Sequence, residues 1–126
     1  LFTGIDTKIS FNTHLVPMTR GILATSYAAV KPGVTQEMLV NCLKETYQNH
    51  PFVRVIEEAN MIGTNRVKGS NYCDVYAKLD ERTGRATIVG VIDNLVKGAA
   101  GQAIQNMNVQ MNLPQTMGLD VVPLFI

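Results

Sequence analysis

Two neighbouring apolar stretches, residues 72–79 and 86–92, limit most strongly what this chain can fold into. In the first stretch every second side chain is apolar, which is the pattern of a strand with one buried face. Its inward set is Cys73, Val75, Ala77 and Leu79. A polar turn containing Gly84 leads to the second, more apolar stretch. Two strands joined by a short polar turn predict an antiparallel hairpin.

The other segments predict additional strands and two helices. Residues 9–30 favour extended structure, with Pro17 and Gly21 as irregular points, and residues 52–56 predict a short strand. Thr35 suits the N-cap of a helix that ends before Pro51. The apolar stripe of that helix is Met38, Leu39, Cys42, Leu43 and Tyr47.

A last helix is expected over residues 95–111, before a tail of coil. Its apolar stripe is Ala100, Ala103, Ile104, Met107 and Met111. The larger side chains expected in the core are Tyr47, Phe52, Met107 and Met111. This order of elements predicts an α+β fold whose mixed or antiparallel sheet carries helices on one face.

The composition argues against several classes of partner. Hydrophobic residues make up 46% and charged residues 17%, which is typical of a globular domain with a real core. A net charge of +1 without a basic block does not suit nucleic acid, and no apolar run approaches the ~20 residues that span a bilayer. No spacing among His14, His50, Cys42 and Cys73 resembles a metal site.

Both cysteines are interpreted as packing residues. Cys42 lies on the apolar side of the first helix and Cys73 faces inward from its strand. Neither position offers the base, cation or helix N-terminus that activates a thiol. We therefore expect two buried, reduced thiols in a cytoplasmic protein and no nucleophile among them.

The passage from strand to helix at residues 93–103, with the sequence DNLVKGAAGQA, is the best candidate for a site. Gly98 and Gly101 each cost a helix ~1 kcal/mol relative to alanine, so their presence needs a reason. One reason is a ligand: the helix N-terminus suits an anion or a carboxamide, and Asn94 can donate and accept hydrogen bonds there. The other is tight packing of the helix against the sheet with no ligand at all.

A second candidate pairs His14 with Arg20. Six residues apart on an extended segment, they lie on the same face if no bulge intervenes. Arg20 suits a carboxylate or a phosphate because its planar guanidinium binds both oxygens at once. The alternative is a salt-bridged surface arginine beside a solvated or core histidine.

Three segments taken together resemble a known enzyme family. They are residues 14–22 (HLVPMTRGI), residues 69–74 (GSNYCD) and residues 92–108 (IDNLVKGAAGQAIQNMN), and Gly118-Leu119 follows them. Their identity, order and spacing resemble the C-terminal half of N-acetyl-gamma-glutamyl-phosphate reductases, from about Ser10 to the end of the chain.

The resemblance implies a two-part enzyme of arginine biosynthesis. A Rossmann domain binds NADP, and its substrate-side partner carries the subunit interface. A cysteine in the N-terminal half of such an enzyme forms a thioester from the acyl phosphate, and NADPH reduces it. We therefore expect residues 1–93 to form a substrate-binding and dimerisation domain. Residues 94–126 are expected to form a helix and tail that return to the NADP-binding domain.

The resemblance also assigns residues. Asn94, Gly98 and Gly101 match the cofactor side, and His14 and Arg20 match the substrate side. Apart from the resemblance, we also expect Lys97 on the substrate side. The expected partners are thus NADP, a small acyl phosphate, the Rossmann half and a second copy of the protein. The apolar sheet face expected to self-associate includes Val89, Val91, Ile22 and Ala24.

Two alternatives to a part of the reductase stay open. One is a non-catalytic dimerisation or interaction module derived from that enzyme. The other is a small binding domain for acidic metabolites that uses Arg20 and Lys97.

Overall fold

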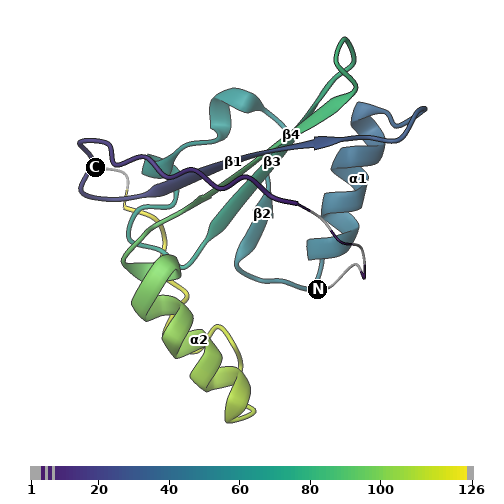
Figure 1. Cartoon of the computed structure of the whole chain (residues 1–126). Coiled ribbons are helices and arrows are strands. Elements are labelled where there is room, and N and C mark those ends of the chain that lie inside the picture. Colours follow the sequence, from purple (N-terminus) through teal and green to yellow (C-terminus); the bar gives the residue numbers. More distant parts are fainter. Residues whose placement is uncertain (1–3, 5, 7, 125–126) are drawn as a thin grey trace.

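The computed structural model describes residues 4, 6 and 8–124, and is built around one four-stranded sheet (Figure 1). The strands are β1 (Ile22–Ala29), β2 (Val53–Val55), β3 (Cys73–Asp80) and β4 (Arg85–Ile92). They lie in the order β1-β4-β3-β2. β3 and β4 form the expected antiparallel hairpin, β1 pairs antiparallel with β4, and the short β2 pairs parallel with β3. The α+β fold with a mixed sheet is confirmed.

Helix α1 (Gln36–Tyr47) packs against β3 and β2 (Figure 1). The hydroxyl of Thr35 accepts a hydrogen bond from the backbone N–H of Met38 at 3.2 Å, so the expected N-cap is confirmed. Gln36 ties the helix to the sheet: its amide donates to the carbonyl of Ala77 at 2.9 Å and accepts from the N–H of Leu79 at 2.7 Å. This side chain replaces the ladder partner that β3 lacks where the three-residue β2 has ended.

The core lies along β3 and β4, between α1 and the segment that joins β2 to β3. That segment contains two short 3₁₀ turns, η1 (Ala59–Met61) and η2 (Thr64–Arg66). An ion pair joins the strands on either side of this segment: Arg54 of β2 binds both carboxylate oxygens of the buried Asp74 of β3 at 2.6 and 3.0 Å. The buried apolar side chains are Phe52, Val67, Val75, Ala77, Ala86, Val91 and Leu119.

The last helix differs from the expectation at its start and on its surface. A π-helical turn, η3 (Val96–Ala100), precedes α2 (Gly101–Gln110), and the helix projects from one end of the sheet (Figure 1). The two residues that α2 buries are Gly101 and Asn108. The predicted apolar stripe is exposed, so placing Met107 and Met111 in the core was wrong. Instead the amide of Asn108 donates to the carbonyls of Gln115 and Met117 and holds the C-terminal tail.

Two further expectations fail. Residues 8–20 form no strand and are exposed up to Thr19, so extended pairing begins only at Ile22. Cys42 is exposed on α1, because the helix buries none of its residues completely and only half-buries Leu39, Val40, Leu43 and Tyr47. The helical period located the apolar side of α1 correctly, but one helix lying on a narrow sheet leaves that side open at its margins.

Candidate functional site

The carboxylate of Asp93, fully buried just after β4, organises the end of the sheet. Arg20 binds it through two nitrogens: Nε donates to Oδ1 at 3.2 Å, and Nη2 pairs with Oδ2. The N–H of Gly69 donates to Oδ2 at 2.6 Å, and those of Leu95 and Val96 donate to Oδ1 at 2.8 and 3.2 Å. One carboxylate thus joins the segment before β1, the loop before β3 and the first turn of η3.

These contacts determine the charge state of Asp93. Burial of the carboxyl group opposes ionisation, but the hydrogen bonds from Gly69, Arg20, Leu95 and Val96 outweigh it and lower the pKa of Asp93 below its ordinary value. The helix N-terminus is therefore already occupied by an anion of the chain itself. The anion site that the sequence allowed there is not available, because the N–H groups of Leu95 and Val96 bind Asp93.

Asn94 follows Asp93 in the chain and binds the backbone of the segment before β1. Its Oδ1 accepts a hydrogen bond from the N–H of Gly21 at 2.7 Å. A backbone N–H can only donate, so this contact fixes which end of the amide faces Gly21. Within the part of the chain that the structure describes, Nδ2 of Asn94 donates to no partner. The side chain is half-buried and presents a hydrogen-bond donor at the surface.

The two glycines of the helix start have different neighbours. A Cβ built on Gly101 would collide with Oδ1 of Asn71 and with Val96, so the close approach at Gly101 is made by the same chain. Gly98 is exposed, and its nearest neighbour for a Cβ is the carbonyl of Asp93 at 3.3 Å. Of the two, only Gly98 leaves its outer side open to a ligand.

Lys97 belongs to a polar network on the inner side of the helix. Its Nζ donates to Oε1 of Gln105 at 2.7 Å, and the same oxygen accepts from Nδ2 of Asn71 at 2.9 Å. Nζ also lies 5.6 Å from the centre of the Phe52 ring. Burial lowers the pKa of Lys97, while the nearby thiol of Cys73 acts in the opposite direction. Lys97 is thus partly desolvated and already held by an uncharged partner.

The predicted substrate residues do not converge. Arg20 lies at the Asp93 carboxylate, Lys97 lies beside Gln105, and His14 is exposed in the segment before β1. Among the residues that the structure describes, His14 forms no hydrogen bond or ion pair with a side chain. The structure links two of the six predicted site residues that lie far apart in the sequence: Arg20 binds Asp93, and the neighbouring Gly21 donates to Asn94.

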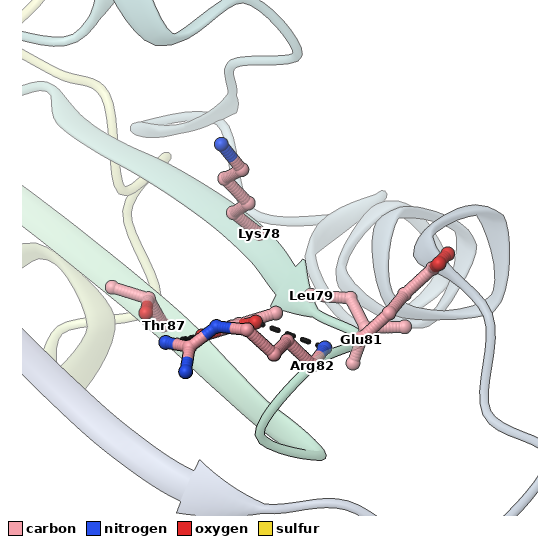
Figure 2. Close-up of a pocket in the computed structure, with 6 residues that line it drawn as sticks. Lys78, Leu79, Glu81, Arg82 and Thr87 are labelled. Atoms are coloured by element: carbon pink, nitrogen blue, oxygen red, sulfur yellow. Dashed lines mark hydrogen bonds and ion pairs between the residues drawn. The ribbon is translucent and has the colours of Figure 1, made fainter.

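A surface hollow at the tip of the β3–β4 hairpin is a separate feature (Figure 2). The labelled side chains of Lys78, Glu81 and Arg82 point in different directions there, and Arg82 pairs with Asp80 at 3.7 Å. The tip is at the opposite end of β4 from Asp93, roughly 23 Å away at the usual rise per strand residue. In the described part of the chain no three His, Cys, Asp or Glu side chains gather as they do around a metal ion.

Sequence reasoning missed the buried polar residues that hold this corner together. Asp93 carried a usable signal, since an aspartate between a strand and a helix is a common cap. Asn71 and Gln105 carried none, because their partners lie 34 residues apart in the sequence. Their contact depends on the helix turning back over the end of the sheet.

The comparisons with known proteins agree with this architecture. A family model described as "Semialdehyde dehydrogenase, dimerisation domain" matches residues 1–94. The chain belongs to this dimerisation-domain family. The matched region holds all four strands, α1 and the Asp93–Asn94 corner of the domain, and it ends where the helical segment begins.

The curated relatives of this dimerisation domain are longer proteins named N-acetyl-gamma-glutamyl-phosphate reductase. One from Symbiobacterium thermophilum is 56% identical over 92% of the chain and 33% of its own length. A relative from a Geobacillus strain is 53% identical over 93% of the chain and 34% of its own length. A relative from Geobacter metallireducens is 50% identical over 99% of the chain and 36% of its own length. The chain spans about a third of the length of these relatives. Within its described residues, no helix is long and apolar enough to cross a membrane.

Proposed function

We propose that this chain is the dimerisation and substrate-side part of a cytoplasmic, NADP-dependent reductase that converts N-acetyl-gamma-glutamyl phosphate to N-acetylglutamate semialdehyde in arginine biosynthesis. The names of the relatives support the reaction, and the family's own description implies that the domain oligomerises. The observation that carries the proposal is the outward Nδ2 of Asn94 at the end of β4, beside the exposed Gly98.

This donor suits one part of a nicotinamide dinucleotide and not another. A carboxamide oxygen accepts from an amide N–H, and Gly98 has no side chain to block its approach. The cofactor's phosphates do not suit the same corner, because the ionised Asp93 already occupies the nearby N–H groups and would repel a second anion. The phosphates are therefore assigned to the part of the enzyme that lies outside this chain.

Within the complete enzyme each residue of the corner has a separate task. NADPH supplies the hydride, and the nucleophilic cysteine belongs to the part of the enzyme outside this chain. Asn94 orients the carboxamide end of the cofactor, and the small Gly98 lets it approach. Gly101 supports this surface from behind, where Asn71 and Val96 pack against it.

The exposed apolar surface of the last helix fits the same assembly. Leu95, Ile104, Met107 and Met111 are all exposed, which leaves an apolar stripe without a partner in this chain. We assign this stripe to packing on the NADP-binding half. On the substrate side we retain His14 and Lys97. Arg20 is committed to Asp93 and is not assigned to the substrate.

The decisive experiment uses the complete enzyme, with NADPH oxidation followed in the presence of N-acetyl-gamma-glutamyl phosphate. Substrate-dependent oxidation is expected, and its absence would reject the function. Asn94→Ala should lower turnover and weaken NADPH binding, and should lower the melting temperature modestly because the N–H of Gly21 loses its acceptor. A variant with wild-type kinetics and a lower melting temperature would reduce Asn94 to a structural acceptor for Gly21.

The two glycines supply an internal control for the cofactor contact. Gly98→Ala should weaken NADPH binding and destabilise the protein less than Gly101→Ala, because the tightest contact of its new Cβ is 3.3 Å, to the carbonyl of Asp93, against a direct collision with Asn71 at Gly101. Gly101→Ala should destabilise the protein through the clash with Asn71. Equal effects of the two substitutions on stability would contradict the difference between their surroundings.

A further inference from the structure

The ion pair and the amide hydrogen bond at the end of the sheet form a single link between two chain segments. Residues 20 and 21 precede β1, and residues 93 and 94 follow β4, its antiparallel neighbour. The first contact joins Arg20 to Asp93, and the second joins the N–H of Gly21 to Oδ1 of Asn94. Because both contacts join adjacent residues, the position of Arg20 also sets the position of Gly21.

Gly21 is held from both sides. Its φ of +103° is a conformation that side-chain-bearing residues rarely adopt, and a Cβ there would lie 2.5 Å from Cβ of Thr64. The peptide of Gly21 is therefore close to η2 on one side and bound to Asn94 on the other. Holding this peptide in place keeps Oδ1 of Asn94 inward and Nδ2 outward.

Arg20 is poorly suited to any other task. Both oxygens of its partner are buried, while its own side chain is 30% exposed. A guanidinium that left Asp93 for the carboxylate or phosphate of a substrate would leave a buried charge without its cation, which is strongly unfavourable.

We propose that Arg20 is a positioning residue: through Asp93 and Gly21 it holds the amide of Asn94 so that Nδ2 donates to a carbonyl oxygen of the bound ligand. This inference rests on the proposed function, in which that ligand is NADPH and the oxygen belongs to its carboxamide. It replaces the expected role of Arg20 as a clamp for the substrate.

The chain offers a matched control in the pair of Arg54 with Asp74. There too a partly exposed arginine, 36% exposed, binds both oxygens of a buried aspartate. That pair ties β2 to β3 and to the carbonyl of Arg66, and no residue adjacent to it presents a donor like that of Asn94. Loss of either arginine removes a similar contact, but loss of Arg20 alone is expected to disturb Asn94.

The experiment measures the dissociation constant of NADPH by nicotinamide fluorescence in the complete enzyme without substrate, together with the Michaelis constant for the acyl phosphate and the melting temperature. Asn94→Asp keeps an acceptor for Gly21 but replaces the donor with an oxygen, so the dissociation constant should rise about tenfold or more. Arg20→Met should raise it about threefold, since part of the same hydrogen bond is lost, and Arg20→Lys should fall between Arg20→Met and wild type.

The double variant Arg20→Met/Asn94→Asp should bind NADPH no more weakly than Asn94→Asp, because Arg20 acts through Asn94. Arg54→Met should lower the melting temperature as Arg20→Met does and leave the dissociation constant unchanged. The proposal is overturned if Arg20→Met raises only the Michaelis constant for the acyl phosphate, if Arg54→Met weakens NADPH binding equally, or if the effects of the two substitutions add.

The remaining outcomes also test the assignment of the donor, this inference and the proposed function. An unchanged dissociation constant in Asn94→Asp overturns the assignment of the donor. If Arg20→Met does not fold, Arg20→Lys and its double variant with Asn94→Asp carry the same comparison. A wild-type enzyme that binds no NADPH rejects the proposed function itself, whereas normal wild-type binding with unaffected Arg20 variants rejects this inference alone.

Discussion

The two halves of the sheet, the β2–β3 side and the β1–β4 side, are stabilised differently. On the β2–β3 side, α1 packs against both strands, and Arg54 binds both Asp74 and the carbonyl of Arg66 in η2; Asp74, Val75 and Ala77 are buried there. On the other side, β1 pairs with β4 along all eight of its residues, yet every one of those residues is exposed. We call these regions the covered side and the bare side of the sheet.

The difference shows where this chain folds by itself and where it offers a surface to something else. β1 has the sequence ILATSYAA, with no charged residue and no proline, which is unusual for an edge strand that remains in water. Its backbone is secured by the β4 ladder and by the Arg20–Asp93 pair, so burial of its side chains is not needed to hold it. A dimerisation domain requires such a surface.

The largest expected contrast comes from truncating one aromatic side chain on each side. Phe52, 2% exposed, packs beside Tyr72 on the covered side, and Tyr27, 69% exposed, lies in β1. Phe52→Ala should lower the free energy of unfolding by about 3–5 kcal/mol, because a large cavity forms. Tyr27→Ala should change it by no more than about 0.5 kcal/mol. Urea unfolding of the dilute 126-residue chain measures both, and similar losses would show that β1 is covered in solution.

The next effect tests the link between the two sides. Asp93→Asn removes the charge that Arg20 pairs with, and should cost about 2–3 kcal/mol, less than for a fully buried pair because Arg20 is partly exposed. The pKa of Asp93 is lowered in the folded protein, so its contribution is fully present only well above the pKa of about 3.9 of an unfolded aspartate, from about pH 5 upward. The contribution is then lost as the pH falls from about 5 through the folded pKa.

Unfolding free energies of wild type and Asp93→Asn between pH 7 and pH 3 measure this dependence. The two curves should be well separated at pH 7 and should converge on the acid side. A constant separation over that range would mean that Asp93 stabilises the corner without its charge. Asp74→Asn on the covered side supplies a comparison for a second buried carboxylate.

The sequence predicted the covered side better than the bare side. Alternation in residues 73–79 identified β3, and the turn at Gly84 identified the hairpin, because both signals are local. The limits of β1 were missed, since residues 9–20 have a similar β-favouring composition but no strand to pair with. An apolar pattern also predicts that side chains are buried, but it does not indicate which part of the protein covers them. Met107 and Met111 were assigned to the core for that reason, although in this chain they are exposed.

The candidate site was only partly accessible from the sequence. Asn94, Gly98 and Gly101 were predicted as cofactor residues because an amide and two costly glycines stand together between strand and helix, and that role stays a prediction. That Arg20 would meet Asp93, 73 residues further on, depends on β1 lying beside β4. Spacing within the segment suggested a shared face for His14 and Arg20, but that segment is not a regular strand, so parity carried no information there.

A third effect concerns assembly and should leave stability almost unchanged. Ala24 and Tyr27 lie on opposite faces of β1, because alternate residues of a strand point in opposite directions. Replacing the residue at the subunit interface with arginine should weaken self-association of the complete protein about tenfold or more, since a charge is poorly tolerated at the centre of an interface. Sedimentation of Ala24→Arg and Tyr27→Arg shows which face takes part.

Asn41→Arg is the control for that measurement, because Asn41 is exposed on α1 of the covered side. Unchanged association in both β1 variants would show that the bare side is not part of the subunit interface. A loss of association in Asn41→Arg alone would instead move the interface to the covered side.

The smallest effect is a difference in the labelling rates of the two thiols, which measures how often the covered side opens. Cys42 is exposed on the outside of α1, whereas Cys73 lies half-buried at the start of β3. Burial raises the pKa of the Cys73 thiol; Lys97 opposes this shift and Asp74 adds to it. Because the thiolate is the reactive form, a disulfide reagent such as DTNB should label Cys42 rapidly and Cys73 at least about tenfold more slowly at neutral pH. Cys42→Ser should remove the fast phase and leave the slow one, whereas Cys73→Ser should do the reverse. If both thiols react at one rate, the start of β3 opens often enough to expose Cys73, and the covered side is closed no more tightly than the bare side.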